Sequence, residues 1–188
     1  MKRAYLSQQM WWIFLCVFTC SMLSSQVWAD SVITIESLTT EKQEQSIQVN
    51  CEVTYRLDEK VKQALSNGIM MTFITDLELL ERTSNWFDQV RASYQTEFTI
   101  KYHALSKQFV LSINNLERSY PDLFSVFYQQ AQLCDFRMGP IDHIQLDESI
   151  YLRARIRLST EDLPLPLRIK SYLSNDWRPS SGWTIWSL

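Results

Sequence analysis

The stretch SIQVNCEVTYRL, residues 46–57, shows most clearly which kind of fold the sequence predicts. Apolar and polar side chains alternate along it without interruption. In an extended strand successive side chains point to opposite faces, so this period of two places one set in a core and the other in water. The pattern is typical of an antiparallel strand with one buried face. The residues expected to face the core are Ile47, Val49, Cys51, Val53, Tyr55 and Leu57.

The same alternation recurs through much of the chain and predicts further strands. YLRARIRL (151–158) repeats it most regularly, with three arginines on its polar face. EFTIKYHALSKQFVLSI (97–113) predicts two strands joined by a short turn. The remaining candidates are VITIESL (32–38), IMMTFITDLELL (69–80) and, more weakly, IDHIQL (141–146).

Two segments have helical patterns instead. DEKVKQALSNG (58–68) opens on Asp58, a good N-cap, and ends at Gly68, which accepts the left-handed conformation after a helix. PDLFSVFYQQAQL (121–133) begins with a proline, which a first helical turn tolerates. The chain is therefore expected to be mainly β, a two-layer antiparallel β-sandwich with two short helices. The alternative is an α+β roll with both helices on one face of a single curved sheet.

The first 29 residues are expected to be an export signal. Lys2 and Arg3 precede the uncharged apolar run WWIFLCVFTCSML (11–23), and Val27 and Ala29 stand at the −3 and −1 positions of a cleavage site. Cleavage after Ala29 would leave residues 30–188 as a single β-rich domain in the periplasm. The alternative is an uncleaved anchor in the inner membrane through residues 10–29, because that run is long enough to span a bilayer.

The charge of the body argues against a nucleic-acid partner. Removing Lys2 and Arg3 from the 18 basic residues leaves 16 against 21 acidic residues, a net charge of −5. Nucleic-acid binding asks for a basic field instead. Contact with a membrane is expected only through the N-terminal segment, if that segment is not cleaved.

Few residues are suited to catalysis. The chain has three glycines and two histidines, so it offers no phosphate-binding loop or dinucleotide turn. No grouping has the spacing of a zinc site. His103 follows the outward-facing Lys101 and could serve a hydrolase as general base, although a turn histidine is the favoured reading. We expect no enzymatic activity, no cofactor and no metal.

Cysteines and arginines suggest two further features. Cys16 and Cys20 lie in the signal, so Cys51 and Cys134 could form a single disulfide in an oxidising compartment; two buried thiols are the alternative. The three arginines of the strand, Arg153, Arg155 and Arg157, would form a ladder with about 6.6 Å between successive members. This ladder could bind an anionic group or an acidic partner strand. The alternative is pairing with acidic residues of a neighbouring strand, such as Asp76 and Glu78.

The stretch DWRPSSGWTIWSL (176–188) contains three tryptophans, which could bind a carbohydrate or peptidoglycan. If it ends in a strand, Trp183 and Trp186 point to opposite faces. Trp183 is expected in the core, leaving Trp177 or Trp186 to pack on the helix side or meet a partner. Upstream, Pro164 and Pro166 cannot donate into a sheet, so their segment is expected along a sheet edge or between sheets.

The chain also resembles a known family through several short motifs. These are R-x-R-L (155–158), LP-x-PL (163–167), D-W (176–177) and S-x-W-x-x-W (181–186), with EKVKQALSNGIMMTF (59–73) and IKYHALSKQFVL (100–111) upstream. Together they resemble an exported proteobacterial domain-of-unknown-function family, the one numbered 4390. The resemblance implies export, a single domain, no assigned activity, and genes beside a membrane sensor kinase and a ribosomal RNA methyltransferase.

These observations favour a non-enzymatic envelope protein that binds another envelope protein. The sensory part of a kinase is one such partner. A carbohydrate or peptidoglycan module and a hydrolase around His103 are the second and third hypotheses.

Overall fold

The alternating stretch at residues 46–57 forms the middle strand of a small sheet. The structure, a computed structural model, describes residues 32–43, 46–83, 87–132, 135–141, 144 and 146–188. β2 (Ser46–Arg56) pairs with β1 (Val32–Gln43) on one side and with β7 (Asp135–Met138) on the other, both antiparallel. The side chains of Ile47 and Val49 are buried as the alternation predicts.

A second, larger sheet carries the arginine strand. Its order is β6-β5-β4-β3-β8-β9, and every neighbouring pair is antiparallel. β3 lies in the middle of this order, and eight of its eleven residues are buried because both of its faces are covered. The strands are β3 (Met71–Glu81), β4 (Gln89–His103), β5 (Gln108–Ile113), β6 (Leu116–Tyr120), β8 (Ile150–Leu158) and β9 (Thr184–Ser187).

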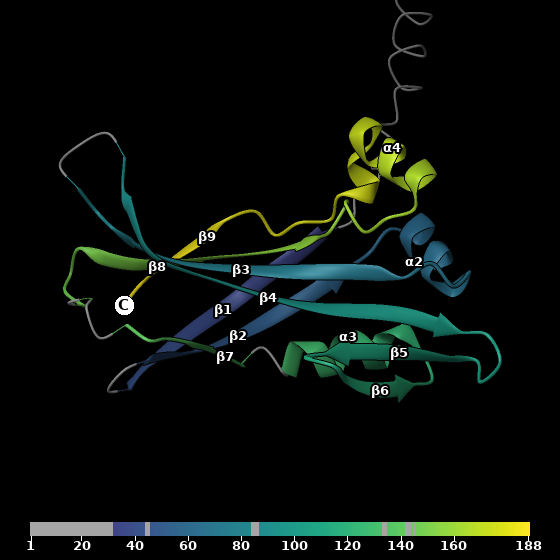
Figure 1. Ribbon diagram of the computed structural model, residues 1–188, viewed down its shortest axis with the longest axis horizontal. Helices are drawn as coiled ribbons and strands as arrows, with labels where there is room; N and C mark the ends of the chain where they lie inside the picture. Colours follow the sequence, from purple (N-terminus) through teal and green to yellow (C-terminus); the bar gives the residue numbers. More distant parts are fainter. Residues whose placement is uncertain (1–31, 44–45, 84–86, 133–134, 142–143, 145) are drawn as a thin grey trace, which may run out of the picture.

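The two sheets form the layers of a sandwich that share one apolar core (Figure 1). An aromatic cluster joins the layers: the ring of Tyr55 on β2 lies 6.2 Å from those of Phe73 on β3 and Phe98 on β4, between centroids. Phe127, which belongs to the helix α3 (Leu123–Gln132), stacks on Tyr55 with 4.9 Å between the ring centroids. The predicted two-layer antiparallel sandwich is confirmed, and the single curved sheet of the alternative is not what the chain forms.

Both predicted helices are present. α2 (Glu59–Ser66) starts after Asp58, whose Oδ1 accepts a hydrogen bond from the backbone N–H of Lys60 at 2.8 Å. Gly68 follows the helix with φ of +86°, the left-handed conformation expected there. α3 begins at Leu123, and its N-terminal turn is capped by Asp122 rather than started by Pro121.

A third helix corrects the sequence prediction for the proline-rich segment. α4 (Leu165–Leu173) occupies the stretch that was expected to run along a sheet edge or between sheets. Pro164 is its N-cap and Pro166 lies in its first turn, where the missing N–H groups would have had no helical partner in any case. The prolines therefore start this helix instead of preventing it. Within the described part of IDHIQL, no strand is formed.

The helices lie at different places on the sandwich. α4 and α2 lie together at one end of the long strands, and α3 lies beside β5 and β6 (Figure 1). A one-turn 3-10 helix, η1 (Asn175–Trp177), follows α4 and contacts both α4 and α2. Among the described residues, none of the helices has the length and apolar character needed to cross a membrane.

Candidate functional site

The arginine ladder lies directly opposite two carboxylates of β3. The antiparallel register places Arg155 opposite Asp76 and Arg153 opposite Glu78. Arg153 donates to Glu78 Oε2 from Nε at 2.7 Å, and Arg155 donates to Asp76 Oδ2 from Nε at 3.1 Å and from Nη2 at 2.8 Å. Of the two interpretations of the ladder, pairing with acidic residues of a neighbouring strand is therefore the one that the structure shows.

Asp76 is the centre of this polar cluster. Its Oδ2 also accepts a hydrogen bond from Arg157 Nε at 3.0 Å, and its Oδ1 accepts one from Gln95 Nε2 at 2.8 Å. Partial burial by itself would raise the pKa of Asp76, but the hydrogen bonds from Arg155, Gln95 and Arg157 outweigh it and hold that pKa below its usual range. The carboxylate therefore stays ionised at neutral pH. Its hydrogen bonds link β3 to both of its neighbours, β4 and β8.

Trp183 covers the outer side of the ladder. The guanidinium carbons of Arg153 and Arg155 lie 4.3 Å and 4.4 Å from its ring centroid, within the range of a cation–π contact. The ladder thus has carboxylates on one side and an indole on the other. Binding an external anion there would require displacing one of these contacts.

The tryptophans are distributed differently from the sequence prediction. Trp183, expected in the core, lies half-buried against the arginines, whereas Trp186 is half-buried against the core beside Leu152. Trp183 and Trp186 do point to opposite faces, as the alternation predicted, but the face that carries Trp186 is the one that packs on the core. Trp177 is buried, with 7% of its surface exposed. The three indoles therefore do not form a flat platform on one surface, the arrangement that a carbohydrate module of this kind would use.

The segment that carries these tryptophans runs along β8. Leu158 N–H donates to the carbonyl of Pro179 at 3.0 Å, and Ser181 N–H donates to the carbonyl of Ile156 at 2.9 Å. Further along, β9 pairs with residues 151–154. At the other end of the segment, Lys60 of α2 donates to Asp176 of η1 at 2.5 Å. This ion pair raises the pKa of Lys60 and lowers that of Asp176.

His103 and the cysteines are not grouped with other residues into a recognisable catalytic site in the described part of the chain. His103 is exposed at the end of β4, opposite Gln108 in the hairpin register. Cys51 is disulfide-bonded; Cys134, its predicted partner, lies outside the described residues, so this pairing stays a prediction. Within the described part of the chain, no cluster of histidine, cysteine, aspartate or glutamate could hold a metal ion.

An exposed apolar surface on α4 was not expected from the sequence. Leu167 and Ser171 face the body, and Ser171 is buried. The opposite side of the helix exposes four large side chains, at 66%, 54%, 70% and 82% of their surface. These residues, which we call the α4 patch, are Leu165, Ile169, Tyr172 and Leu173. Sequence reasoning missed the patch because it did not predict the helix, although the i, i+4, i+7, i+8 spacing was visible.

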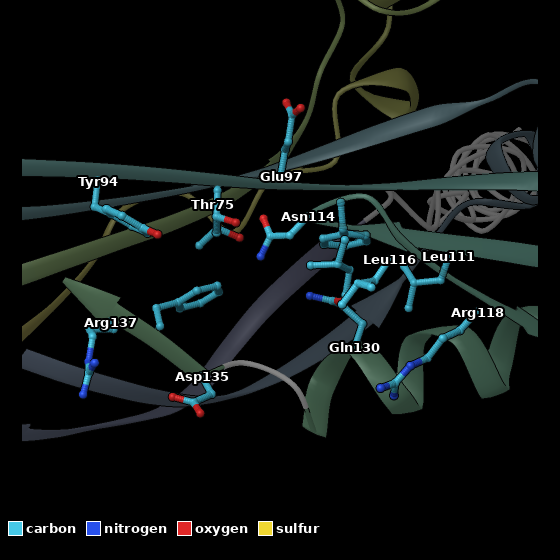
Figure 2. Close-up of a pocket in the computed structure, with 14 residues that line it drawn as sticks. Thr75, Tyr94, Glu97, Leu111, Asn114, Leu116, Arg118, Gln130, Asp135 and Arg137 are labelled. Carbon is cyan, nitrogen blue, oxygen red and sulfur yellow. The ribbon is translucent and has the colours of Figure 1, made fainter.

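A pocket of about 390 Å³ opens between the two sheets (Figure 2). Its wall is formed by β4 and β5 on one side and by α3 and β7 on the other. Phe98 and Leu111 are buried at its wall, while Arg118, Asp135 and Arg137 are exposed at its rim. No single stretch of sequence indicates this pocket, because its residues come from six elements and one turn. The one local signal is a glutamine, Gln130, in the apolar stripe of α3.

The fold and these sites define an antiparallel β-sandwich with an internally paired arginine ladder, an apolar helix face and an inter-sheet pocket. The chain belongs to the family described as Domain of unknown function (DUF4390), whose profile matches residues 30–187. No curated protein and no solved structure matches the chain.

Proposed function

We propose that this protein is an exported, non-enzymatic binding module of the cell envelope that docks another envelope protein through the α4 patch. The observation that carries this proposal is the exposure of four large apolar side chains on one side of a single helix. Proteins rarely leave such a surface uncovered, and contiguous exposed apolar patches commonly mark interaction sites. Anchors at i, i+4, i+7 and i+8 suit a helix that lies in a groove of its partner.

The charges around the patch support a protein groove over a lipid surface. Lys170 is exposed on α4 beside the apolar anchors, so an apolar groove with an acidic rim complements it. The body as a whole carries five more acidic than basic residues, since Lys2 and Arg3 are the only charges before Asp30. An anionic membrane surface would repel that body. The family resemblance makes the sensory part of a membrane kinase one partner to examine first.

Site-specific crosslinking in the envelope tests this proposal. A photo-crosslinking amino acid at position 172 should capture one defined envelope protein, and the same group at Tyr128, an exposed residue on α3, should not. Export is tested in the same strain by recovery of the mature chain, starting at Asp30, from the periplasmic fraction. Equal capture from both positions, or capture of phospholipid alone from position 172, would contradict docking of a protein through α4.

Binding of the purified partner provides the quantitative test. The double variant Ile169→Ser with Leu173→Ser should weaken binding about tenfold or more, as expected for central anchors of an interface. The matched control is Leu105→Ser with Leu116→Ser, which removes two exposed leucines, one from the β4–β5 turn and one at the start of β6. The control should bind like the unaltered protein. If both double variants lose affinity equally, or if the α4 variant instead loses binding to phosphatidylethanolamine–phosphatidylglycerol vesicles, the proposal is wrong.

A further inference from the structure

The pocket between the sheets contains a buried polar atom for which the described residues provide no hydrogen-bond partner. α3 packs its apolar stripe on the core through residues 123, 126 and 127, and Gln130 takes the next position of that stripe. Only 5% of the surface of Gln130 is exposed. Its Oε1 atom is buried and accepts no hydrogen bond from any described residue. Buried amides are nearly always hydrogen-bonded, so this exception calls for a donor.

The side chain that carries this oxygen forms part of the pocket wall. Gln130 lines the pocket, and Figure 2 shows its side chain rising from α3 into the space below β4 and β5. The volume of about 390 Å³ falls within the range of small-molecule sites. We propose that this pocket binds a small aromatic compound whose hydroxyl or N–H group donates to Gln130 Oε1 and whose acidic group lies at the rim.

The aromatic part of the ligand follows from the pocket wall. The rings of Phe98, Phe136 and Tyr94 all line the pocket, and the aliphatic Leu111 and Ile113 complete its apolar surface. Three aromatic rings in the pocket wall favour a flat ring, because offset and edge-on ring pairs add to the gain from burial alone.

The acidic group follows from the rim. Arg118 of β6 lies at one end of the rim and Arg137 and Asp135 of β7 at the other, while Glu97 is directed away from the pocket in Figure 2. Arg137 also donates to Gln43 Oε1 at 2.7 Å, which holds its side chain at this edge. Two guanidinium groups against one carboxylate favour a carboxylate on the ligand over an amine.

A matched pair of probes tests the hydrogen bond. 6-Hydroxy-2-naphthoic acid carries the ring, the acid and the donor, whereas 6-methoxy-2-naphthoic acid carries a methyl group in place of the donor hydrogen. Titration followed by protein NMR should give a dissociation constant about 3- to 10-fold lower for the hydroxy compound, the value of one net hydrogen bond. Shifts should localise to the backbone around Ile113 and Phe136. Equal affinity, a preference for the methoxy compound, or no binding of either probe would overturn the proposal.

Three variants assign the effect to its atoms. Gln130→Met keeps the length of the side chain without the amide, so it should bring the ratio of the two constants to about one. It should also raise the thermal midpoint, because an unsatisfied buried group is removed. Arg118→Gln should weaken both probes equally, and Glu117→Gln, its neighbour on β6, should weaken neither. If Gln130→Met still binds the hydroxy compound more tightly than the methoxy compound, a residue other than Gln130 accepts the hydrogen bond. The α4 double variant should keep the ratio, so the two proposals can fail separately.

Discussion

Arg155 of β8 lies directly opposite Asp76 of β3, and its Nη2 donates to Asp76 Oδ2 at 2.8 Å. The pair lies between two neighbouring inner strands of the larger sheet and is partly buried: the side chains are 30% and 12% exposed, respectively. Charged pairs in such positions are costly to break, because the remaining partner keeps its desolvated charge. The sheet is therefore sensitive to changes at Asp76.

Asp76→Asn is expected to lower the free energy of unfolding by about 2 kcal/mol at pH 7, since hydrogen bonds to a charged acceptor are lost. The pKa of Asp76 is lower in the folded than in the unfolded chain, so its contribution is complete above the unfolded value of about 4. It is lost as the pH falls through the folded value. Urea unfolding from pH 7 to pH 2.5 should therefore show the two proteins converging at low pH.

The control for Asp76→Asn is Glu117→Gln, which removes an exposed carboxylate from the edge strand β6. It should differ from the unaltered protein by less than about 0.5 kcal/mol at every pH. A constant difference between Asp76→Asn and the unaltered protein across this pH range would show that the ionised carboxylate is not the source of the effect.

Trp183→Ala should destabilise the fold by about 1–2 kcal/mol, because the indole faces two guanidinium groups and each contact is worth about 0.5–1 kcal/mol. Trp183→Phe, which keeps an aromatic face, should recover part of the loss. Double-mutant cycles with Arg153→Met and Arg155→Met measure each contact directly. Coupling energies near zero in both cycles would mean that the indole contributes by packing alone.

Cys51 is predicted to pair with Cys134. Asn50, which precedes Cys51, is opposite Asp135, which follows Cys134, in the register of β2 and β7. Peptide mapping of the unreduced protein after alkylation should recover the two cysteines in one linked peptide. Reduction should lower the free energy of unfolding by about 2–4 kcal/mol, as expected for a long closed loop. Alkylation of Cys134 without prior reduction would exclude the pairing.

The sequence predicted the structure correctly wherever the spacing of apolar residues in a segment fitted only one kind of element and only one inward face. Residues 46–57 and 151–158 alternate cleanly, so their strands and inward faces could be predicted. The alternation around Trp183 and Trp186 offered two apolar faces, and only the register with β8 decides which one is inward. α4 was missed because Pro164 and Pro166 were interpreted as marking a segment along a sheet edge or between sheets, whereas they lie where a helix begins.

The candidate sites were less predictable than the strands. The ladder and its acidic partners could be proposed, because outward arginines on one strand call for opposite charges on the next. Trp183 stacking on them depends on a chain reversal that composition does not specify. The pocket joins residues of β3, β4, β5, β6, α3 and β7 that are distant in sequence. Only Gln130, a polar residue in an apolar helical stripe, marked it locally.

The position of Asp76 also has a consequence for how the chain reaches this fold. Gln95, which donates to one oxygen of Asp76, is 19 residues away, whereas Arg155, which donates to the other, is 79 residues away. The first contact belongs to a hairpin that closes locally, and the second needs a long loop to close. Folds rich in such high-contact-order pairings form in milliseconds to seconds, so β8 and the segment along it should join last. Until then one edge of β3 stays open, and the chain is exposed to pairing with other chains for that time.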